Sequence, residues 1–226
     1  MEEIGVRALA HFGGFTFDIE TLEMTWLAMA IVIIVSYLGT RSLKLVPSGC
    51  QNIIEMFVTG MDGQVKVMMG ERGKMLAPFI VSLFMFLLVS NLLGLIPGFS
   101  SPTNDLNTTL GLAILVIGMV HVIGLKNQGM GWIAHFFKPM PFLFPINLVE
   151  ELAKPITLAF RLFGNILAGE ILILILLDLT RWWIIPSVLW LAFSIFISCV
   201  QAFIFTMLST AYLANAVNEP EKEDAQ

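Results

Sequence analysis

The sequence predicts an all-α integral membrane protein, and three observations support this fold class. The 226-residue chain is 57% hydrophobic, and its mean hydropathy is +0.86. Only 13% of its residues are charged, against about 25% in a soluble domain. Three long stretches, 75–104, 106–125 and 182–218, contain no charged residue. Because a membrane helix needs about 20 apolar residues, each stretch is long enough to cross a bilayer.

The alternation of apolar and polar segments predicts about five membrane helices and one interfacial helix. Over 47–72, apolar residues recur at helical spacing while charges occupy other faces, a pattern typical of a helix at the membrane surface. The span at 108–125 is expected to begin after Asn107, which could cap it. The predicted elements are an outer N-terminal segment (1–22), spans at 24–40, 75–97 and 108–125, the interfacial segment at 47–72, two long helices at 142–179 and 184–217, and a cytoplasmic tail at 218–226.

The last two helices are too long to stand upright in a bilayer. Each has more than thirty residues, or roughly 50 Å at about 1.5 Å per residue, against a hydrocarbon core of about 30 Å. A mismatch of this size predicts strong tilt. We therefore expect a tilted hairpin of two helices over the C-terminal third.

Basic residues indicate the orientation. In the predicted topology, one side of the membrane carries eight of them and the other carries two. By the positive-inside rule this places the N-terminus outside and the C-terminus in the cytoplasm, most simply in a bacterial inner membrane. The two sets are Arg41, Lys44, Lys66, Arg72, Lys74, Lys126, Lys138 and Lys222 on the cytoplasmic side, and Arg7 and Arg181 outside.

Several kinds of chemistry are not indicated. Cys50 and Cys199 lie far apart and are expected to be free thiols, and the three histidines lack metal-ligand spacing. No GxxxxGK[ST] stretch occurs, so no nucleotide site is expected. The sequence thus predicts no cofactor, no metal, no nucleic-acid partner and no catalytic activity of the chain on its own.

Arg161 is the most unusual residue, because an arginine at mid-membrane costs about 3 kcal/mol on insertion scales. Glu170 and Glu151 lie nine and ten residues away on the same helix, too far along its axis for direct pairing. Gly164, Asn165 and Ala168 share the arginine's face, and small residues there permit close approach of another protein. We therefore expect Arg161 to face a partner.

Further polar residues suggest a path for ions on each side of Arg161. Ser194 and Gln201 lie on one polar stripe of the last helix; a serine can bond to its own helix, but a mid-span glutamine needs a partner such as Asn165 or Arg161. Acids divide by depth: Glu150 and Glu151 lie towards the cytoplasm, and Glu170 and Asp178 towards the outside. Two half-paths separated by a fixed positive charge would suit ion transport.

The stretches "KPITLAFRLFGNILAGE" and "VQAFIFTMLSTAYLANA" resemble subunit a of F-type ATP synthases. The resemblance extends to "PSGCQNIIE", "PFIVSLFMFLLVSNLLGLIPG" and "PTNDLNTTLGLA", and so covers most of the chain from Val46 to Ala216. It implies a non-nucleotide-binding stator subunit. Its partners would be a rotating ring of hairpin subunits (subunit c), each with one mid-membrane carboxylate, and the peripheral stalk subunit b.

The resemblance also implies roles for the residues singled out above. Arg161 matches the family's essential arginine. Asn165 and Gln201 match the polar residues with which the family contacts the ring, and Gly164 and Ala168 lie beside them. Glu170 matches the acid of the outer half-channel, which Ser194 and Asp178 would extend, and Ser194 stands where some members carry a histidine. Glu150 and Glu151 match acids near the cytoplasmic opening. Protons are the implied ion.

Two other interpretations remain open from the residues alone. A secondary transporter with an internal carboxylate relay would usually show internal repeats, which five unequal elements do not. A membrane scaffold would use its charges as structural pairs, which the separation of Arg161 from Glu170 disfavours.

Overall fold

The computed structural model describes residues 9–12, 15–41, 44, 47, 49–96, 99–135, 137, 142, 144–179 and 184–218. Within these ranges some helical side chains, including those of Asn165, Glu170 and Asp178, lie outside the described part. Seven α-helices, two short 3-10 helices and one two-stranded hairpin occur in the described ranges. The protein is thus almost entirely helical, as its composition predicts.

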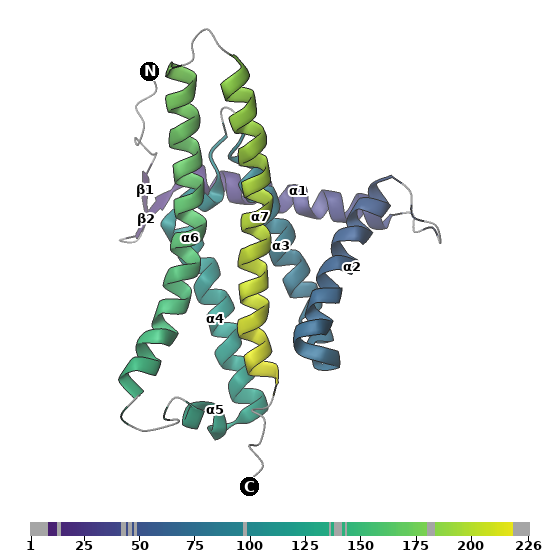
Figure 1. The fold of residues 1–226 in the computed structure, drawn as a ribbon, viewed down its shortest axis with the longest axis vertical. Helices are drawn as coiled ribbons and strands as arrows, with labels where there is room; N and C mark the ends of the chain where they lie inside the picture. The colour runs from purple at the N-terminus through teal and green to yellow at the C-terminus, as the bar shows by residue number, and fades with distance from the viewer. Residues whose placement is uncertain are drawn as a thin grey trace.

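Two long helices, α6 (Phe144–Leu179) and α7 (Ile184–Val217), dominate the structure. They have 36 and 34 residues, which at about 1.5 Å per residue gives roughly 50 Å each. They pack against each other and run side by side along the longest axis of the molecule (Figure 1). The pair expected over 142–179 and 184–217 is therefore a hairpin of continuous helices.

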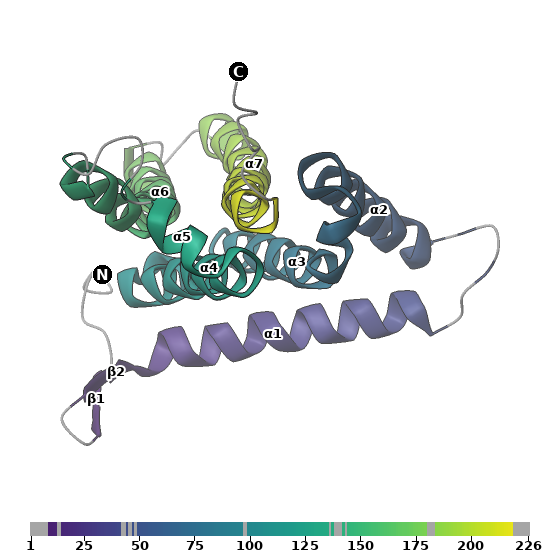
Figure 2. The same cartoon turned by 90° about the horizontal axis from the view of Figure 1, so that it is seen from below.

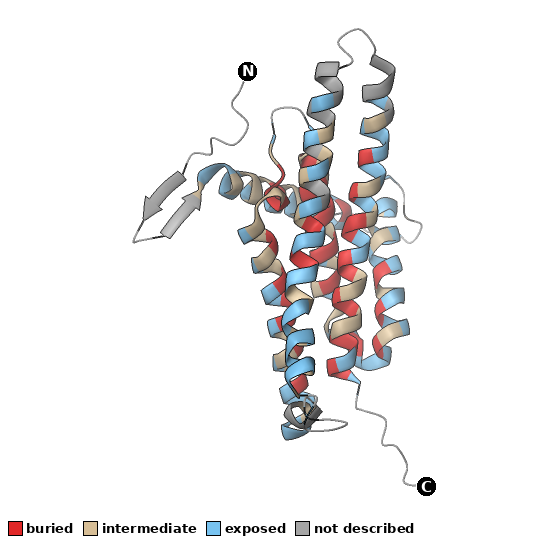
Figure 3. Cartoon of the chain, turned by 60° about the vertical axis from the view of Figure 1, so that its left-hand side comes forward, coloured by how far each residue is buried: buried red, intermediate tan, exposed pale blue. Residues whose placement is uncertain are grey.

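Two shorter helices cover one side of this hairpin. α3 (Ala77–Leu93) packs against α7, and α4 (Leu106–Gln128) packs against both α6 and α7. Their shared core contains Leu87, Val116, Leu162 and Phe205, one from each helix and all fully buried. Buried residues therefore line the inner faces of the four helices, while exposed residues lie on the outer faces (Figure 3).

The first helix, α1 (Ile19–Thr40), runs crosswise to α6 and α7 (Figures 1 and 2). Its N-terminus is capped by Asp18, whose side chain accepts a hydrogen bond from the Thr21 backbone N–H at 3.3 Å. Little of the helix is buried, and Trp26 and Ile33 are 70% and 68% exposed. An apolar helix with so much exposed surface is suited to contact with lipid.

The next segment is a bent pair of helices. α2 (Cys50–Met69) buries Met61, Val65 and Met69, which lie at successive i, i+4 positions, and exposes its other faces. It has the one-sided burial that its amphipathic pattern predicts. After the 3-10 helix η1 (Gly70–Met75), the chain turns by 117° into α3.

Length and composition identify fewer spans than the five that the sequence predicts. Among the described residues, three helical stretches are long and apolar enough to cross a membrane: Ile19–Thr40, Leu106–Gln128 and Trp190–Val217. A fourth span results if the bent pair Gln51–Met75 and Ala77–Leu93 counts as one. The protein is thus a multi-pass membrane protein with three or four candidate spans by these measures.

Three local features differ from the sequence-based expectations. Strands β1 (Leu9–Phe12) and β2 (Phe15–Asp18) pair antiparallel within the segment expected only to lie outside, joined in sequence by Gly13-Gly14, a dipeptide that favours hairpins. Asp105, and not Asn107, caps α4, because its carboxylate accepts a hydrogen bond from the Asn107 N–H at 3.2 Å. A six-residue helix, α5 (Met130–His135), follows α4 and is too short to show a periodic pattern.

Candidate ion-translocation site

Arg161 lies on the outer surface of α6. Its neighbours Leu158, Ala159 and Leu162 are at most 1% exposed and hold one side of the helix in the core. The arginine itself is exposed. Helical periodicity allows this exposure, because position 161 lies about 110° around the helix from the centre of the buried arc formed by positions 158, 159 and 162.

No described acidic side chain pairs with Arg161. The nearest candidate in sequence, Glu151, instead accepts a hydrogen bond from Lys154 Nζ at 2.6 Å. The side chain of Glu170 lies outside the described residues. Within the described part of the chain, the guanidinium is therefore an exposed, unpaired charge on an otherwise apolar surface.

Small residues extend the surface beside Arg161. Gly164 and Ala168 are exposed on the same side of α6. A Cβ atom added at Gly164 would meet no atom of the chain within 4 Å, so packing inside this chain does not require glycine there. The open surface is consistent with close contact by another protein.

Gln201 lies on α7 and is 6% exposed. Its Nε2 is buried and has no hydrogen-bond partner among the described residues. No described bond joins Gln201 to Arg161, and the side chain of Asn165 lies outside the described part. The glutamine is therefore buried within the chain, and the described residues do not bring it together with its predicted partners.

A polar cluster lies near the N-terminal end of α6, about 15 Å along the helix from Arg161. We call it the α6 N-terminal cluster: His121 of α4, Glu151 and Lys154 of α6, and Tyr212 of α7. Lys154 Nζ lies 5.6 Å from the centroid of the Tyr212 ring, and His121 Nε2 lies 3.9 Å from Glu151 Oε1. Glu150 is exposed next to the cluster. The sequence predicts the two acids here but not His121 or Tyr212, which only helix packing brings close.

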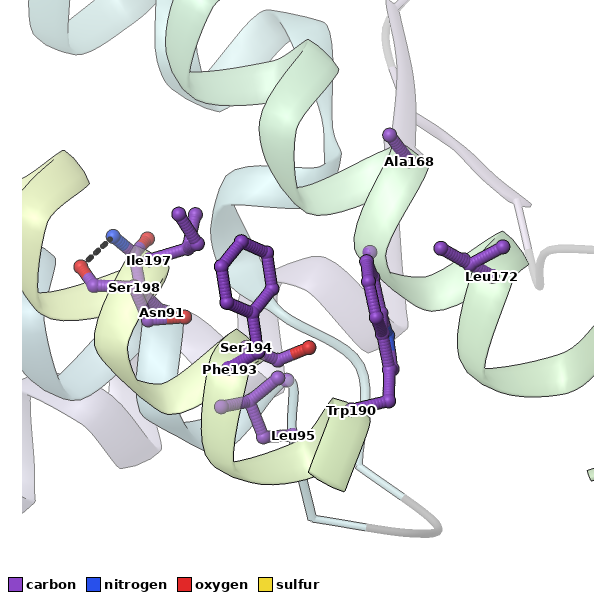
Figure 4. A pocket seen from close by; sticks show the side chains of 11 residues that line it. Asn91, Leu95, Ala168, Leu172, Trp190, Phe193, Ser194, Ile197 and Ser198 are labelled. Carbon is purple, nitrogen blue, oxygen red and sulfur yellow. Dashed lines mark hydrogen bonds between the residues drawn. The ribbon is translucent and has the colours of Figure 1, made fainter. Parts of the chain in front are cut away.

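A cavity of about 180 Å³ lies on the other side of Arg161, between α3, α6 and α7. Trp190 stands between the α6 side chains Ala168 and Leu172 and the α7 side chains Phe193 and Ser194 (Figure 4). Ser194 Oγ and Trp190 Nε1 are buried without described hydrogen-bond partners. A cavity with such polar groups is large enough to hold several water molecules.

A buried hydrogen-bond network forms the α3 side of the cavity. Asn91, which is 1% exposed, donates to the Ser198 carbonyl at 3.3 Å (Figure 4) and accepts from Thr103 Oγ1 at 3.0 Å. Ser101 lies beside Thr103, with 2.7 Å between their hydroxyl oxygens, and donates to the Ser90 carbonyl at 2.9 Å. The network links α3, α7 and the 3-10 helix η2 (Pro102–Asn104).

Of the residues predicted for the outer path, Ser194 lines this cavity, whereas the side chains of Glu170 and Asp178 lie outside the described residues. Asn91 and Ser198 join the site as well. The signal for Asn91 is an amide in the middle of a charge-free apolar stretch, which requires hydrogen-bond partners when buried. The signal for Ser198 is its position one turn from Ser194.

These features define the class of protein: a multi-pass helical membrane protein with an exposed arginine between two separate polar regions, an arrangement that suits ion translocation. Comparison with known proteins identifies the family within this class. The chain matches the family model "ATP synthase A chain" over residues 22–214.

Individual relatives are similar over most of their length. The chain is 44% identical over 213 residues to "ATP synthase subunit a" of Desulforamulus reducens, covering 90% of this chain and 81% of the relative. It is 39% identical over 199 residues to "ATP synthase subunit a" of Moorella thermoacetica, covering 88% and 90%. It is 37% identical over 223 residues to "ATP synthase subunit a 1" of Pelobacter propionicus, covering 97% and 91%.

The chain therefore belongs to the family of ATP synthase A chains, the subunit a of the enzyme. Members form the ion-translocating stator of the membrane sector and are not themselves catalytic. The resemblance found in the sequence is confirmed, and the interpretations as a secondary transporter or a membrane scaffold are set aside.

Proposed function

We propose that this chain conducts protons through two offset half-channels, to and from carboxylates on a rotating ring of subunit c. The observation that carries the proposal is the position of Arg161. It is exposed beside the open surface at Gly164, between the α6 N-terminal cluster and the cavity between α3, α6 and α7. Ion flow couples to ATP synthesis or hydrolysis in the soluble part of the enzyme.

The outer half-channel would use the cavity, with Ser194 on its wall and Glu170 and Asp178 further along α6. A proton entering there neutralises a ring carboxylate. The neutral site then rotates into lipid without the free-energy cost of a bare charge. The polar groups of the cavity support this assignment because they can hold a chain of water molecules.

The cytoplasmic half-channel would use Glu150 and Glu151, which receive the proton after nearly a full turn of the ring. Arg161 attracts each emptied carboxylate and blocks direct flow between the two half-channels, since its guanidinium stays protonated. Asn165 and Gln201 would bond to the passing site, and Gly164 and Ala168 would let the ring approach closely.

The proposed arrangement has five crossings, with the N-terminus outside and the C-terminus in the cytoplasm of a bacterial inner membrane. The crosswise direction of α1 supports strong tilt of α6 and α7 (Figure 1). If α1 crosses the membrane upright, α6 and α7 must be inclined towards the membrane plane. Subunit b and membrane lipid would cover the exposed apolar surface away from the ring.

Substitution of Arg161 tests the proposal. In reconstituted vesicles, the Arg161→Ala complex should assemble but lose proton-driven ATP synthesis, because nothing then holds the carboxylate or blocks the leak. Arg41→Ala is the matched control, since Arg41 is an exposed arginine at the end of α1 and should leave synthesis unchanged. Normal ATP synthesis by the Arg161→Ala complex would falsify the proposal.

A further inference from the structure

The two carboxylate oxygens of Glu151 have different surroundings. Oε2 accepts the hydrogen bond from Lys154 Nζ at 2.6 Å. Oε1 is buried, accepts no hydrogen bond from a described residue, and lies 3.9 Å from His121 Nε2. One oxygen is thus held by a cation, while the other faces an imidazole of a different helix.

Exposure increases from the acid to the imidazole. The side chain of Glu151 is 13% exposed, and that of His121 is 39% exposed. The Trp132 ring of α5 packs edge-on against His121, with ring centroids 6.2 Å apart. His121 therefore lies between a nearly buried carboxylate and the surface of the helix bundle.

The groups around His121 come from each helix that packs against α4. α6 contributes Glu151, which is bonded to Lys154, and Lys154 in turn lies 5.6 Å from the centroid of the Tyr212 ring of α7. On α4 itself, Lys126 lies just over one turn further on and is exposed. The one titratable residue of α5, His135, has its side chain outside the described residues, and η2 packs near the opposite end of α4. Among the described residues, the carboxylate of Glu151 lies 3.9 Å from the imidazole.

We propose that His121 is the proton carrier after Glu151 in the cytoplasmic half-channel. This inference rests on the proposed function and adds to it a residue that the family resemblance does not assign. The neutral Nε2 of His121 takes the proton from the Glu151 carboxylic acid, which leaves a carboxylate and an imidazolium. The imidazolium then releases the proton to water, which restores the neutral ring.

The distance between Glu151 and His121 suits a proton transfer that depends on side-chain motion. At 3.9 Å the two atoms are beyond hydrogen-bond distance, which is about 2.9 Å for nitrogen and oxygen. A small rotation of either side chain closes this gap, and after transfer the ion pair holds them together until the proton leaves. Lys154 remains on Oε2 throughout, so it orients the acid without competing for Oε1.

The experiment uses inverted vesicles that contain the complete ATP synthase, so that the cytoplasmic face is accessible. His121→Gln and His121→Ala should each lower proton-driven ATP synthesis about tenfold or more, as loss of a proton-transferring group does. Added imidazole should restore synthesis in the His121→Ala complex, because it supplies the missing base. The dependence of the synthesis rate on pH should differ from that of the wild type in both variants, because each lacks the imidazole.

His11→Gln is the matched control, because it makes the same change in strand β1 and should alter none of these readouts. Glu151→Gln separates the two proposals. If Glu151→Gln leaves synthesis normal, the cytoplasmic route of the proposed function fails. If Glu151→Gln impairs synthesis while both His121 variants behave like the wild type, only the inference about His121 is overturned.

A purely structural role of His121 is also distinguishable. Loss of synthesis that does not respond to imidazole and keeps the wild-type pH dependence would overturn the proposal. So would failure of both His121 variants to assemble, since a half-exposed proton carrier is not needed for folding.

Discussion

Arg161 shows how one residue obtains its role from its neighbours. Leu158, Ala159 and Leu162 are buried and hold α6 in the core, so the arginine points away from it. Glu151, a described acid of the same helix, is bonded to Lys154, and no described ion pair joins Arg161 to an acid. A charge that lacks a described partner within its own chain is available to the carboxylate of another subunit.

Gly164 leads to a prediction at the residue scale. Gly164→Leu should leave the fold of this subunit intact, because a Cβ atom there meets no atom of the chain within 4 Å and the position is exposed. It should abolish most ATP synthesis if the proposed ring contact is correct, because the added bulk would then keep the ring away from Arg161. Complex yield and synthesis rate would be measured together.

The control for this change is Gly111→Leu on α4, where a Cβ atom likewise meets no atom within 4 Å and the residue is exposed. That variant should retain synthesis. Equal loss of synthesis in both variants would contradict the idea that the surface at Gly164 is specific for the ring.

At the scale of elements, the helices are connected by buried polar groups as well as by apolar packing. Asn91 joins α3 to α7 and to η2, and Glu151 and Lys154 of α6 contact side chains of α4 and α7. Such bonds fix the relative positions of helices that apolar contacts alone would allow to slide. They also keep polar groups next to the two regions where the ion path is proposed.

Asn91→Ala should loosen the contact between α3 and α7. Removing the Asn91 amide breaks two buried hydrogen bonds, which lowers the stability of this junction by about 1–3 kcal/mol. Hydrogen–deuterium exchange in the assembled complex should therefore become about tenfold to a hundredfold faster in η2 and the adjoining turns of α3.

Ser90→Ala provides the comparison for this prediction. The neighbouring Ser90 is also fully buried, but its Oγ has no described hydrogen-bond partner. Its removal should leave exchange unchanged or slower, since no bond is lost. If the two variants exchanged alike, the network around Asn91 would not stabilise this junction.

At the scale of the whole molecule, the number of crossings determines where the termini lie. Three or four spans follow from helix length and composition among the described residues, whereas five follow from charge distribution and the proposed tilt of α6. An odd number places the termini on opposite sides of the membrane. An even number places them on the same side.

Cysteine labelling distinguishes these arrangements. With Cys50 and Cys199 replaced, a single cysteine at Glu3 should react with a membrane-impermeant reagent in right-side-out vesicles. A single cysteine at Ala225 should react only in inverted vesicles. Reaction of both in the same vesicles would contradict the five-crossing topology.

The sequence by itself determined the features that depend on local pattern and composition. It predicts the membrane class from charge-free stretches, a long helix over 142–179 and another over 184–217, and the outward position of Arg161 from helical spacing. These properties follow from periodicity within one helix, which is visible along the chain. The hairpin β1–β2 and the short helix α5 escaped prediction because each is too short for a clear periodic signal.

Only the tertiary structure decided which residues of different helices meet. His121 lies thirty residues before Glu151, and Asn91 more than a hundred before Ser198, yet each pair is in contact or close to it. The core of Leu87, Val116, Leu162 and Phe205 sets these distances by fixing how α3, α4, α6 and α7 cross. Such contacts depend on packing between distant segments, and for that reason no local pattern predicts the cavity or the α6 N-terminal cluster.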